Sequence, residues 1–477
     1  MKLYDLLEDR IKTTLPDTEI SSITDDSRKV CDRCLFVCVK GGSFDGHDFA
    51  EKAIELGAAA VVTDHDIGIV NQIIVDDTRK FYGELCASWF NHPEKRMKLI
   101  GVTGTNGKTT MTTLIKEILT KSGHKVGLIG TIQNEIGDEV IHTDNTTPFA
   151  FDFMELLSKM AKSGCDCVVM EVSSFALIQH RIGPAHFRVA VFTNLTQDHL
   201  DYHGTMEEYY KAKKMLFSRC DVAVINTDDE YGKRLYDEIS CDKYSYSGIE
   251  KADFYTENAV LKANGTTYDF YAGKEKFSVS IAMPGEFNVS NSAQAMAACY
   301  KLGIPLEKVA NLISECKGVK GRCEVIPTGR DFTVICDYAH TPDALLNILP
   351  SVKSYTEGKL ICLFGCGGNR DKTKRPKMAK AAAQFADYLI VTSDNPRDEE
   401  PEQIINDVTE GLRDCKVPYE TITDRKEAIY HSVKIAEKGD VIVLAGKGHE
   451  DYQVLKNNVH IHFDEREVVR EALLELK

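Results

Sequence analysis

Short apolar runs alternate along the chain with segments whose apolar residues recur every three to four positions. Runs typical of strands occupy residues 34–39, 59–63 and 72–75, and a helical pattern lies near 47–56. The pair Gly41-Gly42 marks a turn between the first of these strands and the helix. The pattern predicts a small α/β unit over residues 1–97.

A βαβ pattern opens at residue 98. An apolar strand at 98–103 leads into a Gly-rich turn, a helix that ends at Gly123 and a second strand at 126–130. The apolar residues of that helix follow the 3.6-residue period: Met111, Leu114, Ile115, Ile118 and Leu119. Further strands are predicted at 167–171, 189–193 and 222–226, followed by a hairpin region at 255–281 and a helix at 288–302. We expect this central domain to span residues 98–322.

Strands and helices alternate regularly beyond residue 322. Strands are predicted at 332–337, 360–365, 388–393, 420–423 and 441–445, and helices at 343–354, 375–385, 402–413 and 425–437. Such alternation predicts a doubly wound parallel sheet, which binds ligands outside the carboxyl ends of its strands. This C-terminal domain is expected to span residues 323–477.

Length and charge narrow the classes of function. A chain of 477 residues is long enough for about three domains. Its 58 Lys and Arg residues face 73 Asp and Glu residues, and the resulting net charge of −15 disfavours nucleic acid or an anionic membrane as the main partner. The sequence holds no apolar run of about 18 residues, so we expect no membrane span and a cytoplasmic location.

Cysteine usage agrees with a reducing compartment. Most of the 15 cysteines stand singly in apolar strands, as do Cys167, Cys336 and Cys362, and are expected to be reduced core residues. Cys31 and Cys34 form a lone C-x-x-C pair with no second pair to complete a zinc site.

The Gly-rich turn after residue 103 carries the strongest chemical signal. It reads Gly104, Thr105, Asn106, Gly107, Lys108, Thr109 and Thr110. Between a strand and a helix, such a loop can hold phosphates on its backbone N–H groups while its lysine reaches the β- and γ-phosphates and its hydroxyl a magnesium ion. The general phosphate-loop pattern has a glycine at the position of Val102, so this loop matches a variant of that pattern. The expected fold class is therefore α/β with three domains: a small N-terminal α/β domain, a central P-loop-type ATPase domain and a C-terminal Rossmann-like doubly wound domain.

Two polar groups follow central strands and suit the same site. Glu171 ends one apolar strand, and Asp198-His199-Leu200-Asp201 comes after another. Because hard oxygen ligands suit magnesium, the two groups together with the phosphate loop predict a metal site.

One lysine lies on an apolar helix face. At 100° per residue along 206–217, Glu207, Lys211 and Lys214 share a polar face, whereas Lys213 lies among apolar residues. An inward lysine either extends its ammonium to solvent along its stem or, when buried, becomes a reactive amine with a lowered pKa. The pattern leaves both readings open.

Together these motifs resemble the Mur ligases, the ATP-dependent amide-forming enzymes of peptidoglycan precursor synthesis, along essentially the whole chain. The resemblance implies that Lys213 is carbamylated and bridges magnesium, and that Lys108, Lys213 and His199 are catalytic. It implies metal ligation by Thr109, Glu171, His199 and Lys213. Besides the phosphate loop, it implies ATP contacts at Asn291, Arg322 and Asp337, the last two at a domain junction that needs domain closure.

The resemblance is strongest to family members that act on UDP-N-acetylmuramoyl-L-alanyl-D-glutamate. It implies that the N-terminal domain binds the UDP-sugar and that the substrate contacts are Ser27, Arg28, Asp45, Gly46, His47, Thr146, Thr147, Ser173, Gln179 and Arg181. One departure is Phe175, where many relatives of this subtype carry His and the glutamate-adding relative carries Phe.

The C-terminal domain carries the motif that selects the incoming amino acid. Ser393-Asp394-Asn395-Pro396-Arg397 follows a strand, and by itself it reads as a turn begun by Asn-Pro. Within the resemblance it selects meso-diaminopimelate, through Arg370, Asp394, Asn395, Arg397, Gly446 and Glu450. Arginine suits bidentate capture of the distal carboxylate that distinguishes diaminopimelate from lysine, and Asp394 and Glu450 are suited to its ammonium.

The implied reaction is amide formation through an acyl phosphate, with ATP and Mg²⁺, no redox cofactor and no covalent enzyme nucleophile. A monomer is expected. The alternatives are the lysine-adding ligase of the same family and, more remotely, a folylpolyglutamate synthase, against which the N-terminal domain argues. A nucleotide-binding scaffold without ligase activity would predict loss of Lys108, Glu171 or Lys213, and all three are present.

Overall fold

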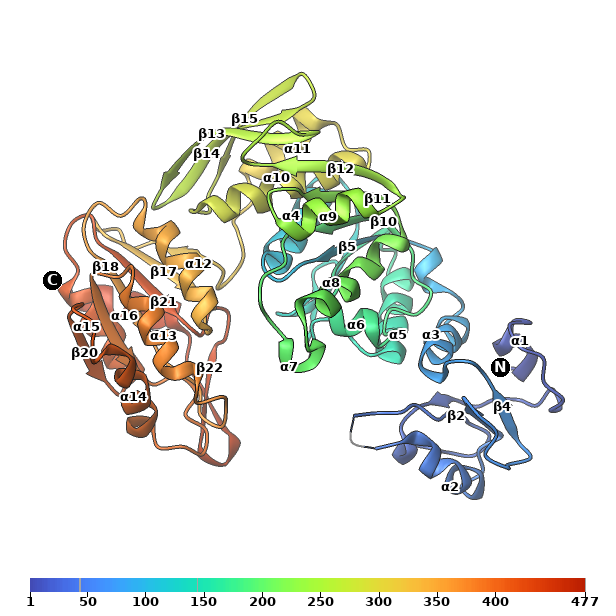
Figure 1. Cartoon of the computed structure of the whole chain (residues 1–477). Helices are drawn as coiled ribbons and strands as arrows, with labels where there is room; N and C mark the ends of the chain where they lie inside the picture. Colours follow the sequence, from blue (N-terminus) through green and yellow to red (C-terminus); the bar gives the residue numbers. More distant parts are fainter. Residues whose placement is uncertain (43, 144, 477) are drawn as a thin grey trace. The chain divides into compact units, whose positions relative to one another are not determined.

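The structure is a computed structural model that describes residues 1–42, 44–143 and 145–476. The chain forms two compact units. The first comprises residues 1–247, 251–254 and 294–306, and the second comprises residues 248–250, 255–293 and 307 to the end of the described chain. Figure 1 labels the helices and strands of both units.

The first unit begins with a small parallel sheet of order β1-β2-β3-β4. Its strands are β1 (Ile23–Thr24), β2 (Leu35–Val37), β3 (Ala60–Thr63) and β4 (Gln72–Ile74), and its helices are α1 (Leu3–Leu7), α2 (Ala50–Glu55) and α3 (Thr78–Trp89). The three predicted strands and the predicted helix are present. Helix α3 was not predicted, although Asp77 caps it by accepting from the Lys80 N–H.

The larger sheet of the first unit surrounds strand β5. Its order is β12-β11-β10-β5-β9-β6-β7-β8, and the strands from β12 to β6 run parallel. The strands are β5 (Lys98–Thr103), β6 (Val126–Ile129), β7 (Asn134–Ile136), β8 (Glu139–Ile141), β9 (Cys167–Glu171), β10 (Phe187–Phe192), β11 (Cys220–Asn226) and β12 (Asp242–Ser247). Because β9 and β10 flank β5, the segments that follow these three strands meet at one edge of the sheet.

Helices join these strands. They are α4 (Lys108–Lys121), α5 (Ala150–Lys162), α6 (Ser174–Ile178), α7 (Leu200–His203), α8 (Met206–Lys214) and α9 (Glu230–Glu238). The five apolar residues predicted for the first helix are all buried on α4. The core around them is almost wholly aliphatic and aromatic, and the free thiol of Cys167 is buried in β9, as predicted.

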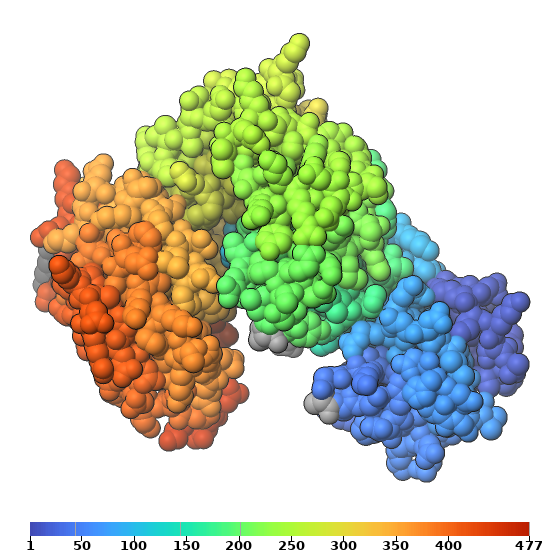
Figure 2. All heavy atoms as spheres, in the orientation of Figure 1, coloured from blue at the N-terminus to red at the C-terminus, as the bar shows by residue number. Residues whose placement is uncertain are grey.

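The second unit includes an antiparallel meander where a hairpin was predicted. It consists of β13 (Phe254–Lys262), β14 (Gly265–Ala272) and β15 (Glu275–Ile281), and Gly273 and Lys274 in the turn between β14 and β15 are exposed. Figure 2 shows this yellow-green segment at the surface. Helices α10 (Glu286–Lys301) and α11 (Leu306–Ser314) follow along the chain, and residues 294–306 of this segment belong to the first unit. Helix α10 was predicted as 288–302.

The C-terminal sheet of the second unit has the order β16-β17-β21-β18-β19-β20. It comprises β16 (Glu324–Ile326), β17 (Thr333–Asp337), β18 (Leu360–Phe364), β19 (Tyr388–Thr392), β20 (Tyr419–Ile422) and β21 (Val441–Ala445), all parallel except β16. Its helices are α12 (Pro342–Lys353), α13 (Lys374–Ala383), α14 (Pro401–Thr409), α15 (Arg425–Ile435) and α16 (Glu465–Glu475).

Helices cover both faces of this sheet. Apolar residues of α12, α13 and α14 form one core cluster with the sheet, and those of α15 and α16 form another. The doubly wound prediction is therefore confirmed. The hairpin β22 (Tyr452–Leu455) and β23 (Val459–His462), together with α16, was not predicted. Within the described residues, none of the helices is long and apolar enough to cross a membrane.

Candidate active site

The predicted phosphate loop joins β5 to the start of α4. Gly104 and Gly107 have φ values of +148° and +87°, a region that favours glycine. A Cβ on Gly104 would overlap the Thr193 hydroxyl, which donates to Asn106 O at 2.6 Å. The glycines thus let the chain turn against β10 and bring the loop to the first turn of a 14-residue helix, where backbone N–H groups are available to an anion.

Lys108 folds back over this loop. Its Nζ donates to Gly104 O at 2.9 Å and to Thr105 O at 2.8 Å. Its side chain therefore crosses the loop that would bind a phosphate. Its ammonium group supplies a fixed positive charge at that loop.

Lys213 reaches the same carbonyl from α8. Its side chain is buried, its Nζ donates to Gly104 O at 2.8 Å, and it lies 4.6 Å from the centre of the Tyr209 ring. Burial, and after it the nearby Lys108 ammonium, lowers the pKa of Lys213 well below its ordinary value. Of the two readings of the sequence, the buried, reactive amine is the one that the geometry supports.

Glu171 is buried at the end of β9, the strand next to β5. Its Oε1 accepts from the Thr131 N–H at 2.9 Å and its Oε2 from the Thr131 hydroxyl at 3.0 Å. A Cβ on Gly130 would lie 2.8 Å from Oε1, so glycine makes room for the carboxylate. Both oxygens are thus held at the sheet edge that carries the phosphate loop.

His199 follows β10 in an exposed turn. Its φ is +53°, and its ring packs edge-on to Phe175 with the centroids 5.1 Å apart. The Asp198 carboxylate accepts from the His199 backbone N–H at 2.8 Å. Phe175, the departure from the family pattern, also packs on Tyr202 at 4.4 Å, so its place in this structure is beside the predicted metal-binding histidine.

A polar network links Glu171 to predicted substrate residues. Thr131, which bonds Glu171, lies 3.0 Å from the Thr146 hydroxyl, and the Thr147 hydroxyl donates to Glu171 O at 2.9 Å. The other members of the network are Ser173, whose Oγ accepts from Thr147, Arg181, which donates to Thr147 O, and Gln179, which accepts from Arg181. The structure therefore brings Thr146, Thr147, Ser173, Gln179 and Arg181 together.

The predicted N-terminal contacts lie in two short turns. Arg28 pairs with Asp26 at 2.8 Å and is otherwise exposed, next to Ser27 in a single 3₁₀ turn. Asp45 caps the turn Gly46–Phe49 by accepting from the His47 N–H. A Cβ on Gly46 would lie 2.6 Å from Val39 N, so this position requires glycine.

The predicted ATP residues Asn291, Arg322 and Asp337 belong to the second unit. Asn291 is buried on α10. Asp337 ends β17 and accepts from the backbone N–H groups of Cys323 at 2.7 Å and Ala339 at 2.8 Å. Burial raises the pKa of Asp337, and the Arg322 guanidinium opposes that shift.

The motif after β19 surrounds a buried lysine. Lys447 Nζ lies 3.1 Å from Asp394 Oδ1, 2.9 Å from Asn395 Oδ1 and 3.2 Å from Glu450 Oε2, and its side chain is fully buried. Lys447 and, to a smaller extent, Arg425 lower the pKa of Asp394 against the effect of burial. Three of the six predicted residues thus meet at one cation.

The other three residues of that motif lie around it. Arg397 has a φ of +53° and donates from Nη1 to Gly368 O at 3.0 Å, and Arg370 is exposed on the neighbouring loop. Gly446 has a φ of +119°, and a Cβ there would lie 3.4 Å from Asp394 Oδ2.

Sequence reasoning missed Lys447, Thr131 and Arg425. Arg425 is fully buried and pairs with Glu465 at 2.7 Å beneath the motif. The signal for Lys447 was available, because Gly446-Lys447-Gly448-His449-Glu450 directly follows the apolar strand β21. Thr131 had no comparable signal.

The chain combines a phosphate loop, where two lysines donate to one carbonyl, with a doubly wound domain. These features define the class of phosphate-loop α/β enzymes that carry an appended Rossmann-like domain. The chain belongs to the Mur ligase family. Its residues 19–89 match the Mur ligase family catalytic domain, residues 102–299 the Mur ligase middle domain and residues 321–448 the Mur ligase glutamate ligase domain. The three-domain α/β fold class is thereby confirmed, while the boundaries at 97 and 322 stay predictions.

Relatives match over nearly the full length. The chain is 45% identical to UDP-N-acetylmuramoyl-L-alanyl-D-glutamate–2,6-diaminopimelate ligase 1 of Clostridium acetobutylicum, over 96% of each chain. It is 44% identical to the corresponding ligase of Bacillus cereus, over 99% of this chain and 98% of the other. A solved structure of a ligase with this name superposes with a TM-score of 0.76 at 33% identity and covers 99% of this chain. A Mycobacterium tuberculosis folylpolyglutamate synthase shares the fold at 16% identity, with a TM-score of 0.61.

Proposed function

We propose that this protein is an ATP-dependent amide ligase that joins meso-diaminopimelate to UDP-N-acetylmuramoyl-L-alanyl-D-glutamate in peptidoglycan precursor synthesis. The observation that carries the proposal is the convergence of Lys108 and Lys213 on Gly104 O at the phosphate loop. Relatives that match nearly the whole chain at 42–45% identity are named for this reaction. The lysine-adding alternative has no such support.

The reaction has two steps. The D-glutamyl side-chain carboxylate attacks the γ-phosphorus of ATP, which releases ADP and leaves an acyl phosphate. The amine of diaminopimelate then attacks the acyl carbon, and the tetrahedral intermediate expels phosphate as the amine loses a proton. Both steps need positioning and charge neutralisation rather than an enzyme nucleophile, and Lys108 supplies a positive charge to the transferring phosphoryl group.

Lys213 is suited to carbamylation. A lysine amine that is neutral can add CO₂ to form a carbamate and release a proton, and its lowered pKa favours the neutral amine. The change replaces a disfavoured second cation beside Lys108 with an anion. Lys108 then attracts the modified side chain instead of repelling it.

The donor set fits magnesium. Glu171 offers a carboxylate at the same sheet edge as the loop, and a carbamate on Lys213 would add further oxygen atoms. We propose that Thr109, Glu171, His199 and carbamylated Lys213 hold Mg²⁺, which when bound neutralises charge on the phosphates. Gly104, Thr105, Asn106, Gly107, Lys108, Thr109 and Thr110 hold the phosphates in this proposal, and Asn291, Arg322 and Asp337 provide further ATP contacts.

The peptide substrate has a preformed surface. The network of Thr146, Thr147, Ser173, Gln179 and Arg181 connects to Glu171 through Thr131, so the carboxylate that is activated would lie close to the magnesium ligands. Ser27, Arg28 and the turn of Asp45, Gly46 and His47 are the proposed contacts to the UDP-sugar.

The amino acid site is proposed around Lys447. Asp394 and Glu450 carry two negative charges and Lys447 one positive charge, so one negative charge remains for the ammonium of diaminopimelate. Arg397, with Arg370 beside it, is placed to receive the distal carboxylate. We further propose that the protein is a cytoplasmic monomer.

Phosphate release tests the proposal. We expect rapid release only when ATP, UDP-N-acetylmuramoyl-L-alanyl-D-glutamate and meso-diaminopimelate are all present. Turnover that is independent of both other substrates would indicate a simple ATPase. Release with a folate substrate instead would favour a folylpolyglutamate synthase.

A further inference from the structure

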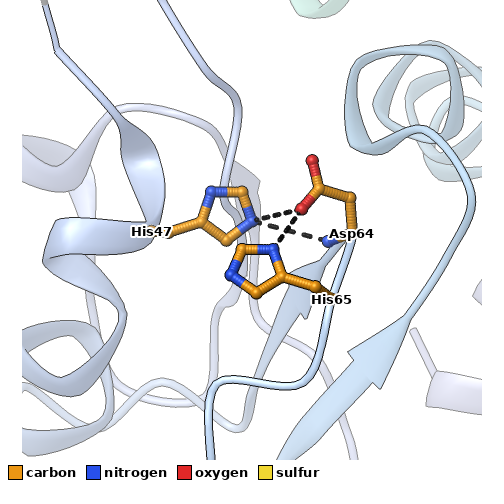
Figure 3. Close-up of side chains that lie close together, drawn as sticks. All are labelled: His47, Asp64 and His65. Atoms are coloured by element: carbon orange, nitrogen blue, oxygen red, sulfur yellow. Dashed lines mark hydrogen bonds and ion pairs between the residues drawn. The ribbon is translucent and has the colours of Figure 1, made fainter.

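Two histidines and an aspartate meet at one edge of the N-terminal sheet (Figure 3). Asp64 and His65 directly follow β3, and His47 belongs to the short turn Gly46–Phe49. Asp64 Oδ1 lies 3.3 Å from His47 Nε2 and 2.5 Å from His65 Nδ1, and the two imidazole centroids are 4.8 Å apart. Neither Asp64 nor His65 is among the proposed substrate contacts.

His47 is oriented by a second carboxylate. Its Nδ1 lies 2.6 Å from Asp45 Oδ1, and the same oxygen accepts from the His47 backbone N–H at 3.1 Å. Because a carboxylate accepts but does not donate, the proton lies on Nδ1. The other nitrogen, Nε2, accepts from the Asp64 backbone N–H at 3.4 Å, so its lone pair points toward Asp64 and His65.

A histidine whose second nitrogen bonds a carboxylate is common at protein metal sites. Histidine ligands commonly donate their second N–H to a carboxylate, which fixes the ring and raises the basicity of the ligating nitrogen. His47 is also held in place by burial, since its side chain is only 9% exposed. Asp45 therefore does more than cap the turn, because it aims Nε2 of His47 at the other two side chains.

The spacing suits a tetrahedral ion. Two ligand atoms about 2.1 Å from such an ion are about 3.4 Å apart, and the distance from His47 Nε2 to Asp64 Oδ1 is 3.3 Å. One ligand atom from each of the three residues lies within 4.8 Å of the others. Asp64 and His65 are solvent-exposed, so small side-chain rotations bring all three to one ion, with the proton of His65 Nδ1 released.

We propose that His47, Asp64 and His65 form a binding site for a zinc-class divalent cation, separate from the magnesium site at the phosphate loop. Two imidazoles and one carboxylate favour zinc, cobalt or nickel over magnesium, which prefers oxygen ligands. The fourth position faces solvent, because Asp64 and His65 lie at the surface.

Titration with Co²⁺ tests the site, because its absorption spectrum reports the ligands. The wild-type protein should bind one Co²⁺ without thiolate-to-metal charge transfer, and Zn²⁺ should displace it. His65→Ala and Asp64→Ala should each weaken binding at least tenfold, as should Asp45→Ala through loss of the orienting bond. His65 and Asp64 are exposed, and an unchanged far-UV spectrum checks that the variants fold.

Two control variants make the result decisive. His186→Ala removes a surface histidine that pairs with Asp221 at 2.8 Å, and it should bind as the wild type does. His124, Asp166 and Cys167 form a second group of possible ligands. If His124→Ala removes the bound ion and His65→Ala does not, or if the spectrum shows thiolate ligation, the assignment is overturned. Absence of stoichiometric binding to the wild type overturns it as well.

Discussion

Lys213 and Gly104 are joined by a buried hydrogen bond that crosses from helix α8 to the phosphate loop, with 2.8 Å between Lys213 Nζ and Gly104 O. Lys108 donates to the same oxygen at 2.9 Å. Two ammonium groups on one carbonyl repel each other, and the buried one loses its charge more readily. Lys108 therefore remains a cation, and Lys213 is the amine that is available for modification.

Lys213→Ala is expected to lose nearly all ligase activity, because the carbamate and its metal ligation are removed. A short-chain carboxylic acid should restore part of the activity by replacing the carbamate. Phosphate release with and without added acetate measures this. An unmodified Lys213 in a crystal structure of fully active enzyme would contradict the carbamate.

Lys108→Ala is expected to abolish amide formation, with a loss of at least 10²–10³-fold if the lysine stabilises the transferring phosphoryl group. The fold should persist, as judged by far-UV circular dichroism. Lys121→Ala, in the exposed last turn of the same helix, is the matched control and should keep normal turnover. Normal turnover in Lys108→Ala would refute the phosphate-loop assignment.

Much of this site could be predicted because the chain order of a parallel sheet fixes which segments meet. Lys108 and His199 follow strands, Glu171 ends one, and β9 and β10 flank β5. The inward direction of Lys213 followed from helical periodicity. Thr131 could not be predicted, because only the folded chain shows that its N–H and hydroxyl bond Glu171. Helix α3 was missed although Phe81, Tyr82, Leu85 and Cys86 recur with helical spacing after the capping Asp77. The hairpin region predicted over 255–281 contains three strands.

Lys447→Met should weaken the amino acid site specifically. Loss of this fully buried cation leaves Asp394 and Glu450 without their shared partner, which we expect to cost about 3–5 kcal/mol of stability. The KM for diaminopimelate should rise while the KM for ATP changes little. Lys438→Met, at an exposed position before β21, is the control. An unchanged KM for diaminopimelate would show that Lys447 has only a structural role.

Acid should destabilise the second unit through Glu399. A hydrogen bond from the buried Arg375 lowers the pKa of Glu399 to about 2. Because this pKa lies below that of the unfolded chain, the stabilisation is fully present above about pH 4.5 and is lost as the pH falls toward 2.

Glu399→Gln should therefore lower stability at pH 7 by about 1–3 kcal/mol, since Asp407 still pairs with Arg375 at 2.7 Å. It should also make the free energy of unfolding, measured with urea, depend less on pH as the pH falls from about 4.5 toward 2. The exposed Glu402→Gln is the control. If the free energy of unfolding depends on acidic pH equally in Glu399→Gln and in the wild type, Glu399 does not cause the acid destabilisation.

Competition between two amino acids shows which of them the enzyme adds. If Arg397 receives the distal carboxylate of meso-diaminopimelate, L-lysine leaves that guanidinium without a partner, and sites of this kind reject such analogues by about 10⁴–10⁵-fold. With ATP, UDP-N-acetylmuramoyl-L-alanyl-D-glutamate and equal concentrations of both amino acids, mass spectrometry should find the diaminopimelate adduct and almost no lysine adduct. Arg397→Ala should lose diaminopimelate addition mainly through a higher KM. Equal amounts of the two adducts from the wild-type enzyme would show that the protein is not a diaminopimelate-selecting ligase.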